Sequence, residues 1–387
     1  MLPSAGGAGT TTMTASRVAD IIAMIDEHTI AGTMSGERVA AFCAMINAHC
    51  HDGSTEILHE GYKLMRRLGK GSGGRVVLAQ RRSTGQTVAV KTIHARRGAR
   101  RPDVGELLKE ACFLAACRGH PYLVGLHGVV RDPRSREYCL VMDYVGSSLN
   151  DHLDRHVEEH GRGFPEAYVR RVMRQLLTGA AAMHERGIIH RDIKPTNILV
   201  DEDDDSMVKL CDYGSAMLIA KAVPPCGLIG TVPYMAPEML LEKPDYDERV
   251  DSWSLGCVMA ELLSGQELFQ SVKTADALRK IFDALGVPGK KTWQGFKSTL
   301  PADQVQQWRA QGQEAQRQDR LRELFPEELL SSHGFHVLKG LLTCNPGKRL
   351  TVAATLRCPW FKVDATESDD ASGFRSGGTE LHKHIVL

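Results

Sequence analysis

The chain reads HRDIKPTN at residues 190–197 and DYG at residues 212–214. The first stretch brings together an acid at Asp192, a cation at Lys194 and an amide at Asn197. A carboxylate can accept a proton from a hydroxyl group, and an amide oxygen can bind a hard cation. Either stretch alone is usually a surface segment or a turn. The residues before and after them therefore decide what they mean.

A glycine-rich segment, GKGSGG at residues 69–74, precedes these stretches. A dinucleotide-binding fold would need a helix after such a segment, but a Val-Val-Leu strand and a second strand follow here. This context predicts a hairpin whose backbone can close over a polyphosphate. The second strand ends in VAVK at residues 88–91. Because a lysine in an apolar strand is costly without a partner, we expect Lys91 to hold phosphates and Glu110, in the next helix, to orient it.

The stretches suggest complementary roles. Asp192 is placed to accept the proton of a substrate hydroxyl, and Lys194 can lie over the transferring phosphate. Asn197 and Asp212 can supply oxygen ligands to Mg²⁺, which keeps waters and prefers phosphate plus one or two protein oxygens. Such a scheme needs positioning and charge neutralisation more than covalent chemistry. Their joint appearance, in order, predicts a phosphoryl-transfer enzyme.

The hydrophobic pattern divides the chain into a small β-rich part and a larger helical part. Strand-like runs are expected at 65–68, 76–79, 88–90, 123–130 and 138–142, with a helix at 104–117. Helices are expected at 165–185, 249–263, 274–285 and 334–343. A β-rich unit followed by a helical one predicts an α+β fold with two lobes.

The same pattern predicts four segments. Residues 1–16 are expected to be disordered, and so is the polar tail at 362–387. Residues 17–60 form a helical extension, because apolar residues recur at helical spacing, and we expect a short helical hairpin there. It could pack on its own chain or bind a partner, and we favour the first. The catalytic domain is expected at 61–361, with a small lobe at about 62–143 and a large one at about 146–361.

Composition excludes several classes of function. The formal net charge is +1 and 25% of residues are charged, so there is no basic field for nucleic acid. No apolar run approaches about 20 residues, so no membrane span is expected. Ten cysteines are scattered without a CxxC pair, which indicates reduced core cysteines in an intracellular protein. We therefore expect a cytoplasmic or nuclear location, or both.

These motifs resemble those of the eukaryotic protein kinases over residues 62–361. The glycine loop, VAVK, HRD, DYG in place of the usual DFG, and APE at 236–238 all appear in the family's order. The resemblance implies a bilobal protein kinase fold with ATP between the lobes and Mg²⁺ as cofactor. Lys194 and Thr231 imply serine or threonine as the acceptor, in place of tyrosine.

The resemblance also assigns the site residue by residue. The implied catalytic residues are Asp192, Lys194, Lys91 and Glu110, and the implied metal ligands are Asn197 and Asp212. The implied nucleotide contacts are Leu68, Gly69, Gly71, Gly74, Val76, Ala89, Lys91, Met142, Asp143, Val145 and Leu199. Outside the nucleotide site, Glu238 is expected to pair with Arg349, and Asp251 to support the catalytic loop.

Within the family, the nearest similarity is to the cyclin-dependent kinases, in a divergent form like the plant F type. The stretches DSWSLGC at 251–257, ELLSG at 261–265 and LLTCNP at 341–346 are typical of them. Protein substrates and a cyclin-like or other activating subunit are the implied partners. However, the part of the expected helix at 104–117 that precedes Glu110 lacks the sequence that cyclins bind. Cyclin dependence therefore does not follow from the residues.

The activation segment departs from the family in a consistent way. Cys226 stands where the activating phosphothreonine would be. Of the three arginines that would hold its phosphate, only Arg191 remains, and Lys109 and Met217 replace the others. Methionine offers no hydrogen bond to a phosphate. These changes predict activation without phosphorylation at this position.

Other departures leave alternatives open. Gly230 and Met235 replace residues that help to demand proline after the target residue, so proline-directed specificity stays open. Ser72 and Gly73 replace an inhibitory Thr-Tyr pair, which leaves serine phosphorylation at residue 72 as an alternative. Cys211 is either a core cysteine, which we favour, or a reactive thiol at the ATP pocket. The alternative to an active kinase is a pseudokinase scaffold, but such proteins usually lose one of the key catalytic residues.

Overall fold

The computed structural model describes residues 13–50, 57–71, 74–92, 103–219, 228–243, 246–288, 293 and 320–362. The chain divides into two units, Met1–Val145 with Cys211–Ala216, and Gly146–Leu210 with Met217–Leu387. The segment Cys211–Ala216 was expected in the large lobe, but it belongs to the first unit. The predictions for Ser72, for Cys226 and for the two ends of the chain (1–12 and 363–387) lie outside the described residues.

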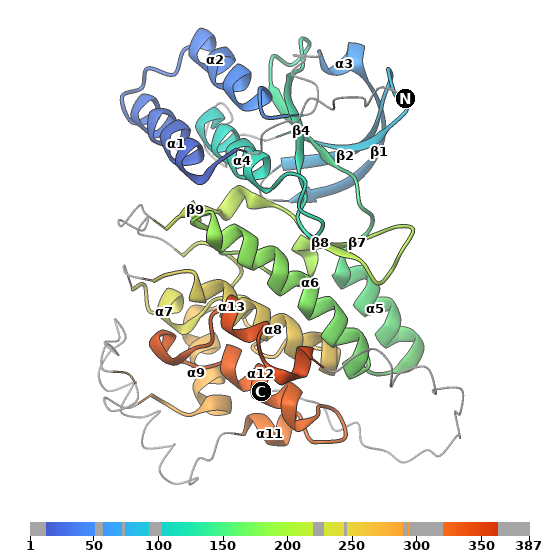
Figure 1. The fold of residues 1–387 in the computed structure, drawn as a ribbon, viewed down its shortest axis with the longest axis vertical. Helices are drawn as coiled ribbons and strands as arrows, with labels where there is room; N and C mark the ends of the chain where they lie inside the picture. The colour runs from blue at the N-terminus through green and yellow to red at the C-terminus, as the bar shows by residue number, and fades with distance from the viewer. Residues whose placement is uncertain are drawn as a thin grey trace, which may run out of the picture. The chain divides into compact units, whose positions relative to one another are not determined.

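The first unit is built on a five-stranded antiparallel sheet. Its strands are β1 (Tyr62–Gly71), β2 (Gly74–Arg81), β3 (Thr87–Thr92), β4 (Leu126–Arg131) and β5 (Tyr138–Asp143), in the order β1-β2-β3-β5-β4. The strands lie where the sequence predicted them, although β4 begins after the expected start at residue 123. The short helix α3 (Leu58–Gly61) precedes β1. Figure 1 shows this sheet in the upper part of the view.

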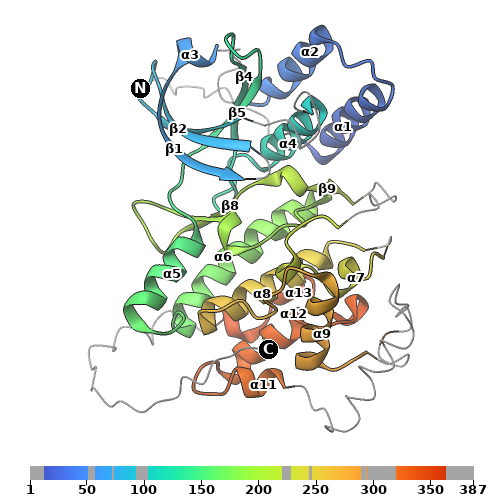
Figure 2. The same ribbon diagram turned by 180° about the vertical axis from the view of Figure 1, so that it is seen from behind.

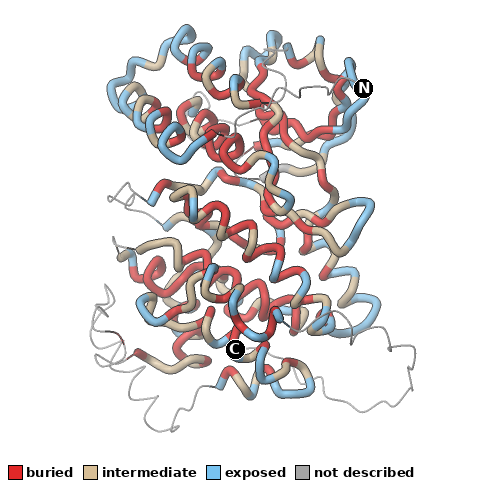
Figure 3. The backbone as a smooth tube through the Cα atoms, viewed as in Figure 1, coloured by how far each residue is buried: buried red, intermediate tan, exposed pale blue. Residues whose placement is uncertain are grey.

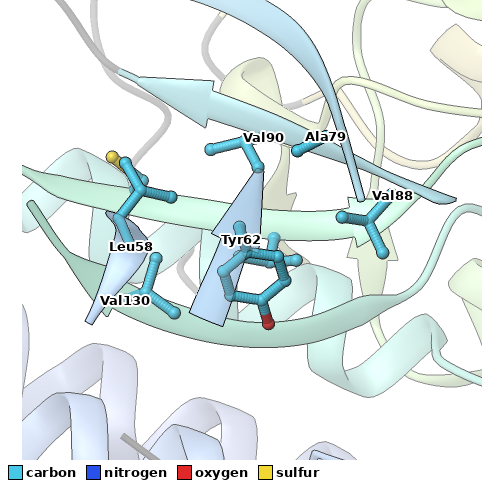
Figure 4. Packing of buried hydrophobic residues seen from close by; sticks show 8 residues of the cluster. Leu58, Tyr62, Ala79, Val88, Val90 and Val130 are labelled. Atoms are coloured by element: carbon cyan, nitrogen blue, oxygen red, sulfur yellow. The ribbon is translucent and has the colours of Figure 1, made fainter. Parts of the chain in front are cut away.

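One face of this sheet carries a compact apolar cluster, which Figure 4 shows from close by. It consists of Leu58, Tyr62, Ala79, Val88, Val90, Val130, Cys139 and Val141, all less than 4% exposed. Side chains alternate between the two faces of a strand, so Ala89 and Lys91 lie on the other face. That second face is the one that carries the candidate site.

Three longer helices complete the first unit. Helix α1 (Ala15–Ile30) is capped by Thr14, α2 (Gly36–Asn47) by Ser35, and α4 (Val104–Cys117) by Asp103. Helix α1 begins before the expected start at residue 17, because the Thr14 hydroxyl accepts a hydrogen bond from the Arg17 backbone. Helices α1 and α2 pack on α4 in both ribbon views (Figures 1 and 2). The prediction of a hairpin that packs on its own chain is confirmed.

The second unit is mainly helical. Its helices are α5 (Leu149–His160), α6 (Glu166–Glu185), α7 (Pro237–Leu240), α8 (Arg249–Ser264), α9 (Thr274–Leu285), α11 (Leu321–Leu324), α12 (Ser332–Leu341) and α13 (Val352–Thr355). Its strands are β6 (Ile188–Ile189), β7 (Ile198–Val200), β8 (Val208–Leu210) and β9 (Met217–Leu218). Short 3₁₀ turns lie at Pro195–Asn197, Val232–Tyr234, Pro346–Lys348 and Pro359–Phe361, with one at Tyr213–Ser215 in the first unit. No helix in the described part of the chain is both long and apolar enough to cross a bilayer.

Helix α8 is the centre of the second unit. Every residue from Val250 to Leu263 is buried, including Trp253, so the helix is covered on all sides. Buried polar groups on a helix of this kind need partners within the unit. Glu261 receives a hydrogen bond from the Tyr234 hydroxyl at 2.7 Å.

Glu261 should make the stability of this unit depend on pH. Burial raises its pKa from 4.5 to about 7, the Tyr234 hydrogen bond lowers it, and the charges of Glu267 and Asp154 raise it further. The folded state therefore disfavours the carboxylate, and the wild type loses stability as pH rises from about 4.5 through about 7. We expect Glu261→Gln, which can still accept the Tyr234 hydrogen bond, to stabilise the protein by up to about 3 kcal/mol at pH 8 and little at pH 5.

Thermal unfolding at both pH values would measure this effect. Glu159→Gln, an exposed change on α5, is the matched control and should alter neither melting temperature. An equal gain from Glu261→Gln at pH 5 and pH 8 would contradict the explanation based on a raised pKa.

Candidate active site

Four candidate nucleotide residues of the first unit share one face of the sheet. Val76 lies opposite Lys91, and Ala89 lies opposite Met142, in the antiparallel registers of β2, β3 and β5. Directly opposite residues point to the same side, and Ala89 and Lys91 are two positions apart. Ala89 and Met142 are buried, and Val76 is partly exposed. At these four positions the face is therefore apolar except for the ammonium group of Lys91.

The ammonium of Lys91 lies between two carboxylates. Its Nζ is 2.6 Å from Glu110 Oε1 on α4 and 2.6 Å from Asp212 Oδ1. Burial alone would lower the pKa of Lys91, but the charges of Glu110 and Asp212 raise it above its ordinary value. Lys91 is thus held as a cation, in the position expected from the sequence.

The backbone around Asp212 is specialised. Asp212 has φ 63° and ψ 78°, in the left-handed region that costs a residue with a side chain about 1–3 kcal/mol. A Cβ at Gly214 would lie 3.4 Å from Asp212 Oδ1 and 3.6 Å from Glu110 Oε2. The Tyr213 ring is buried, and its hydroxyl donates to the Val124 carbonyl at 3.3 Å. The tyrosine that replaces the usual phenylalanine therefore has a partner for its extra hydroxyl.

The segment after β5 is fixed by hydrogen bonds of Asp143. Its carboxylate accepts from the Gly125 backbone at 2.9 Å and contacts His127 Nε2 at 2.9 Å, while its own amide donates to the Gly125 carbonyl. Val145, which follows, is buried. Asp143 and Val145, two of the implied nucleotide contacts, are thus held in place by hydrogen bonds and by burial.

The glycine loop is the connection between β1 and β2. Gly69 pairs with Val76, and Gly71 pairs with Gly74 across the hairpin. Gly74 has φ 140°, which a side chain rarely tolerates. Leu68, just before the loop, is partly exposed. The hairpin predicted from the sequence is present.

The second unit brings three side chains together around Asp192. The Thr231 hydroxyl donates to Asp192 Oδ1 at 2.7 Å and accepts from Lys194 Nζ at 2.6 Å. Lys194 Nζ also lies 3.0 Å from Asp192 Oδ2. Asn197 Nδ2 donates to the Asp192 carbonyl at 2.9 Å and to its Oδ2 at 3.1 Å. The carboxylate of Asp192 is therefore oriented by three neighbours, and Leu199 follows on β7, partly exposed.

Asp251 supports the loop that carries Asp192. Its carboxylate accepts from the backbones of His190 and Arg191, both at 2.9 Å, and from His184 at 2.8 Å. Burial would raise the pKa of Asp251, but the hydrogen bond and charge of His184 and the charge of His190 lower it. Arg191 is held at φ 67°. The role expected for Asp251 agrees with these bonds.

Each unit by itself offers groups of the kind that bind phosphate or magnesium. Lys91 offers a fixed positive charge, and Asp212 offers a carboxylate that is 45% exposed. Because Asn197 uses its Nδ2 on Asp192, its amide oxygen is the atom that a metal could use. Oxygen donors of this kind are what Mg²⁺ prefers.

Sequence reasoning missed part of this arrangement. It named Thr231 for specificity only, whereas the structure places its hydroxyl between Lys194 and Asp192. It gave no role to His184, which holds the Asp251 carboxylate. Neither residue stands in a motif with Asp192, so only the fold reveals the contact.

Comparisons with known proteins agree with this geometry. A family model described as protein kinase domain matches residues 62–361. The chain is 44% identical over 327 residues to a cyclin-dependent kinase F-2 of Oryza sativa subsp. japonica, covering 83% of this chain and 96% of that one. It is 33% identical to cyclin-dependent kinase G1 of Arabidopsis thaliana and 32% identical to mitogen-activated protein kinase 15 of Xenopus laevis. These matches cover 80% and 77% of this chain, which spans about half the length of each of those two relatives.

Proposed function

The chain belongs to the protein kinase family as a cyclin-dependent-kinase-like serine/threonine kinase, and on that premise we propose how its residues use MgATP. Members of this family generally use ATP and Mg²⁺ and act on protein substrates. Lys91 holds the α- and β-phosphates, and Glu110 orients the lysine. Asn197 and Asp212 would hold Mg²⁺, which would supply positive charge to offset the negative charge of the phosphates. The adenine contacts come from Met142, Asp143 and Val145.

Asp192 takes the proton of the acceptor hydroxyl. As that oxygen attacks the γ-phosphorus, the bond to the β-γ bridging oxygen breaks and ADP leaves. The proton ends on an oxygen of Asp192, and Lys194 offsets negative charge on the transferring group. The Thr231 hydroxyl fixes the position of Asp192 relative to Lys194, because it bonds both side chains. The observation that carries this proposal is the set of hydrogen bonds around Asp192.

Phosphate transfer by the purified full-length chain tests the proposal. The chain, MgATP and a generic basic protein are incubated, and the phosphorylated amino acids are identified. We expect phosphoserine and phosphothreonine without phosphotyrosine, and no product when Mg²⁺ is chelated. Binding of ATP without transfer to any hydroxyl would favour the scaffold instead. None of the described residues and none of the comparisons favours that pseudokinase alternative.

We expect no strong requirement for proline after the target residue. Gly230 has φ 114°, and a Cβ there would lie 2.6 Å from the Arg191 carbonyl, so the valine usual in proline-directed kinases does not fit this backbone. A peptide library with and without proline at the next position measures the preference. We expect the kcat/KM values for peptides with and without this proline to differ by less than about tenfold. A small difference in how a binding pocket fits two substrates gives discrimination of this size. A preference of more than a hundredfold would contradict this expectation.

Activation is proposed to need no phosphate on the segment between Asp212 and Thr231. Lys109, one of the positions that would hold such a phosphate, pairs with Asp26 at 3.3 Å and Glu106 at 2.5 Å. Arg191 donates to the Tyr246 hydroxyl at 3.1 Å. Met217 lies in β9, paired with Ile189. These contacts give the three positions roles other than phosphate binding.

A further inference from the structure

Helix α4, which carries Glu110, is covered on two sides. Every residue from Glu110 to Cys117 is buried, as are Leu107 and Leu108 before them. A helix that is buried all round must be packed between two layers. One layer is the sheet, through β4 and β5, and the other is the hairpin of α1 and α2. Figure 3 shows α4 mostly in the colour of buried residues.

The hairpin contacts the face of α4 that points away from Lys91. A Cβ on Gly105 would lie 2.7 Å from Thr29 Oγ1, so the Thr29 side chain of α1 occupies the space that a side chain at residue 105 would need. One turn later, Lys109 pairs with Asp26 of α1. At about 100° per residue, Gly105 and Lys109 share one face, and Glu110 points about 140° away from Gly105. The contacts with α1 therefore lie on the face of α4 opposite to the one from which Glu110 reaches Lys91.

The hairpin is also fixed to the sheet that carries Lys91. The side-chain amide of Asn47, at the end of α2, is buried and bonds both backbone groups of Val129 on β4. Its Nδ2 donates to the Val129 carbonyl at 3.0 Å, and its Oδ1 accepts from the Val129 amide at 2.7 Å. Because β4 is an edge strand, these groups would otherwise lack a ladder partner on that side. Arg118, just after α4, donates to the His49 carbonyl at 3.2 Å.

We propose that the α1–α2 hairpin is an intramolecular brace that positions Glu110 against Lys91, so that this kinase is active without a separate subunit on that face of α4. The brace joins both partners of the ion pair, since α1 holds α4 and α2 holds the sheet. Thr29, Asp26 and Asn47 are positioning residues that act through α4 and β4. This inference rests on the proposed function, because it concerns how the same ion pair is kept closed.

A single methyl group tests the brace in the full-length chain. Gly105→Ala places a Cβ against Thr29 Oγ1, although alanine is otherwise the better helix former by about 0.5–1 kcal/mol. Thr29→Ala/Gly105→Ala removes that clash and leaves the contact of the new Cβ with Asp103 Oδ1, at 3.2 Å. Gly36→Ala is the matched control, because nothing lies within 4 Å of its Cβ position on α2. For each chain, kcat and KM for ATP are measured without any added protein, together with hydrogen exchange of α4 and α8.

The wild type and Gly36→Ala should transfer phosphate equally when alone. Gly105→Ala should lower kcat/KM for ATP by about tenfold or more and speed exchange in α4 but not in α8, since small misplacements of catalytic groups have large effects. The double variant should return to within about threefold of wild type. Full activity of Gly105→Ala, or a loss that the double variant does not reverse, would overturn the brace.

The controls separate this proposal from the proposed function. A wild type that is silent alone but transfers phosphate when an activating subunit is added would overturn the brace and leave the kinase function intact. A wild type that transfers nothing under either condition would overturn both. If Gly105→Ala also exchanged faster in α8, general unfolding would explain the loss of activity, and the brace would be overturned.

Discussion

Asp192→Asn should abolish nearly all phosphate transfer while leaving ATP binding intact. An amide cannot take the proton from the attacking hydroxyl, and loss of a general base usually costs about 10²–10⁴-fold in rate. The amide would also present hydrogens toward Lys194 and the Asn197 Nδ2, both of which now donate to or pair with the carboxylate. We therefore expect kcat to fall by about three orders of magnitude.

Asp192→Asn should lower kcat without changing ATP affinity, because the groups proposed to bind the phosphates do not include Asp192. Lys91, Glu110 and Asp212 form their own ion-pair set within the first unit, whereas Asp192 belongs to the second unit. The affinity for ATP, measured by thermal shift or by a fluorescent nucleotide, should change by less than about threefold. Asp203→Asn, in the exposed turn before β8, makes the same chemical change and should keep wild-type kcat. Retention of more than a tenth of wild-type kcat by Asp192→Asn would refute the role of Asp192 as base.

The sequence predicted the pair of Lys91 and Glu110, and it predicted most of the elements that carry the candidate site. Lys91 and Glu110 were paired from a strand that ends in lysine and a helix that follows, and the structure has them 2.6 Å apart. The five strands of the first unit and most of the longer helices also lie where periodicity predicted them. Helix α5 did not, because LNDHLDRHVEEH buries only Leu149 and Leu153. Its start is fixed by a capping box of Ser148 and Asp151, a local polar signal that hydrophobic patterns do not detect.

Other features depend on contacts between distant parts of the chain. Nothing in the sequence near Asp212 says that this segment belongs with the β-rich unit, and its contacts with Lys91 and Val124 decide that. The run ACFLAAC at 111–117 is apolar on every side, which does indicate a helix between two layers. The identity of the second layer could not be predicted, since it depends on how the α1–α2 hairpin docks.

Removal of the Glu238 carboxylate should have the largest effect on stability. Arg349 donates to both of its oxygens, at 2.6 and 2.8 Å, and the two side chains are 0% and 2% exposed. Glu238→Ala would leave a buried guanidinium with backbone carbonyls and the face of Trp253 as its remaining partners. An uncompensated buried charge costs about 3–5 kcal/mol, or about 10 °C in Tm for a unit of this size.

Comparison with an exposed pair separates burial from charge. Arg279 and Asp283 on α9 are 3.5 Å apart and 50% and 34% exposed, so Asp283→Ala should cost less than about 1 kcal/mol. Replacing both buried partners, in Glu238→Met/Arg349→Met, removes the isolated charge and should recover part of what Glu238→Ala loses, because the penalty lies in the orphaned group more than in the lost attraction. A double variant less stable than Glu238→Ala would instead mean that the carbonyl contacts of Arg349 contribute more than its ion pair.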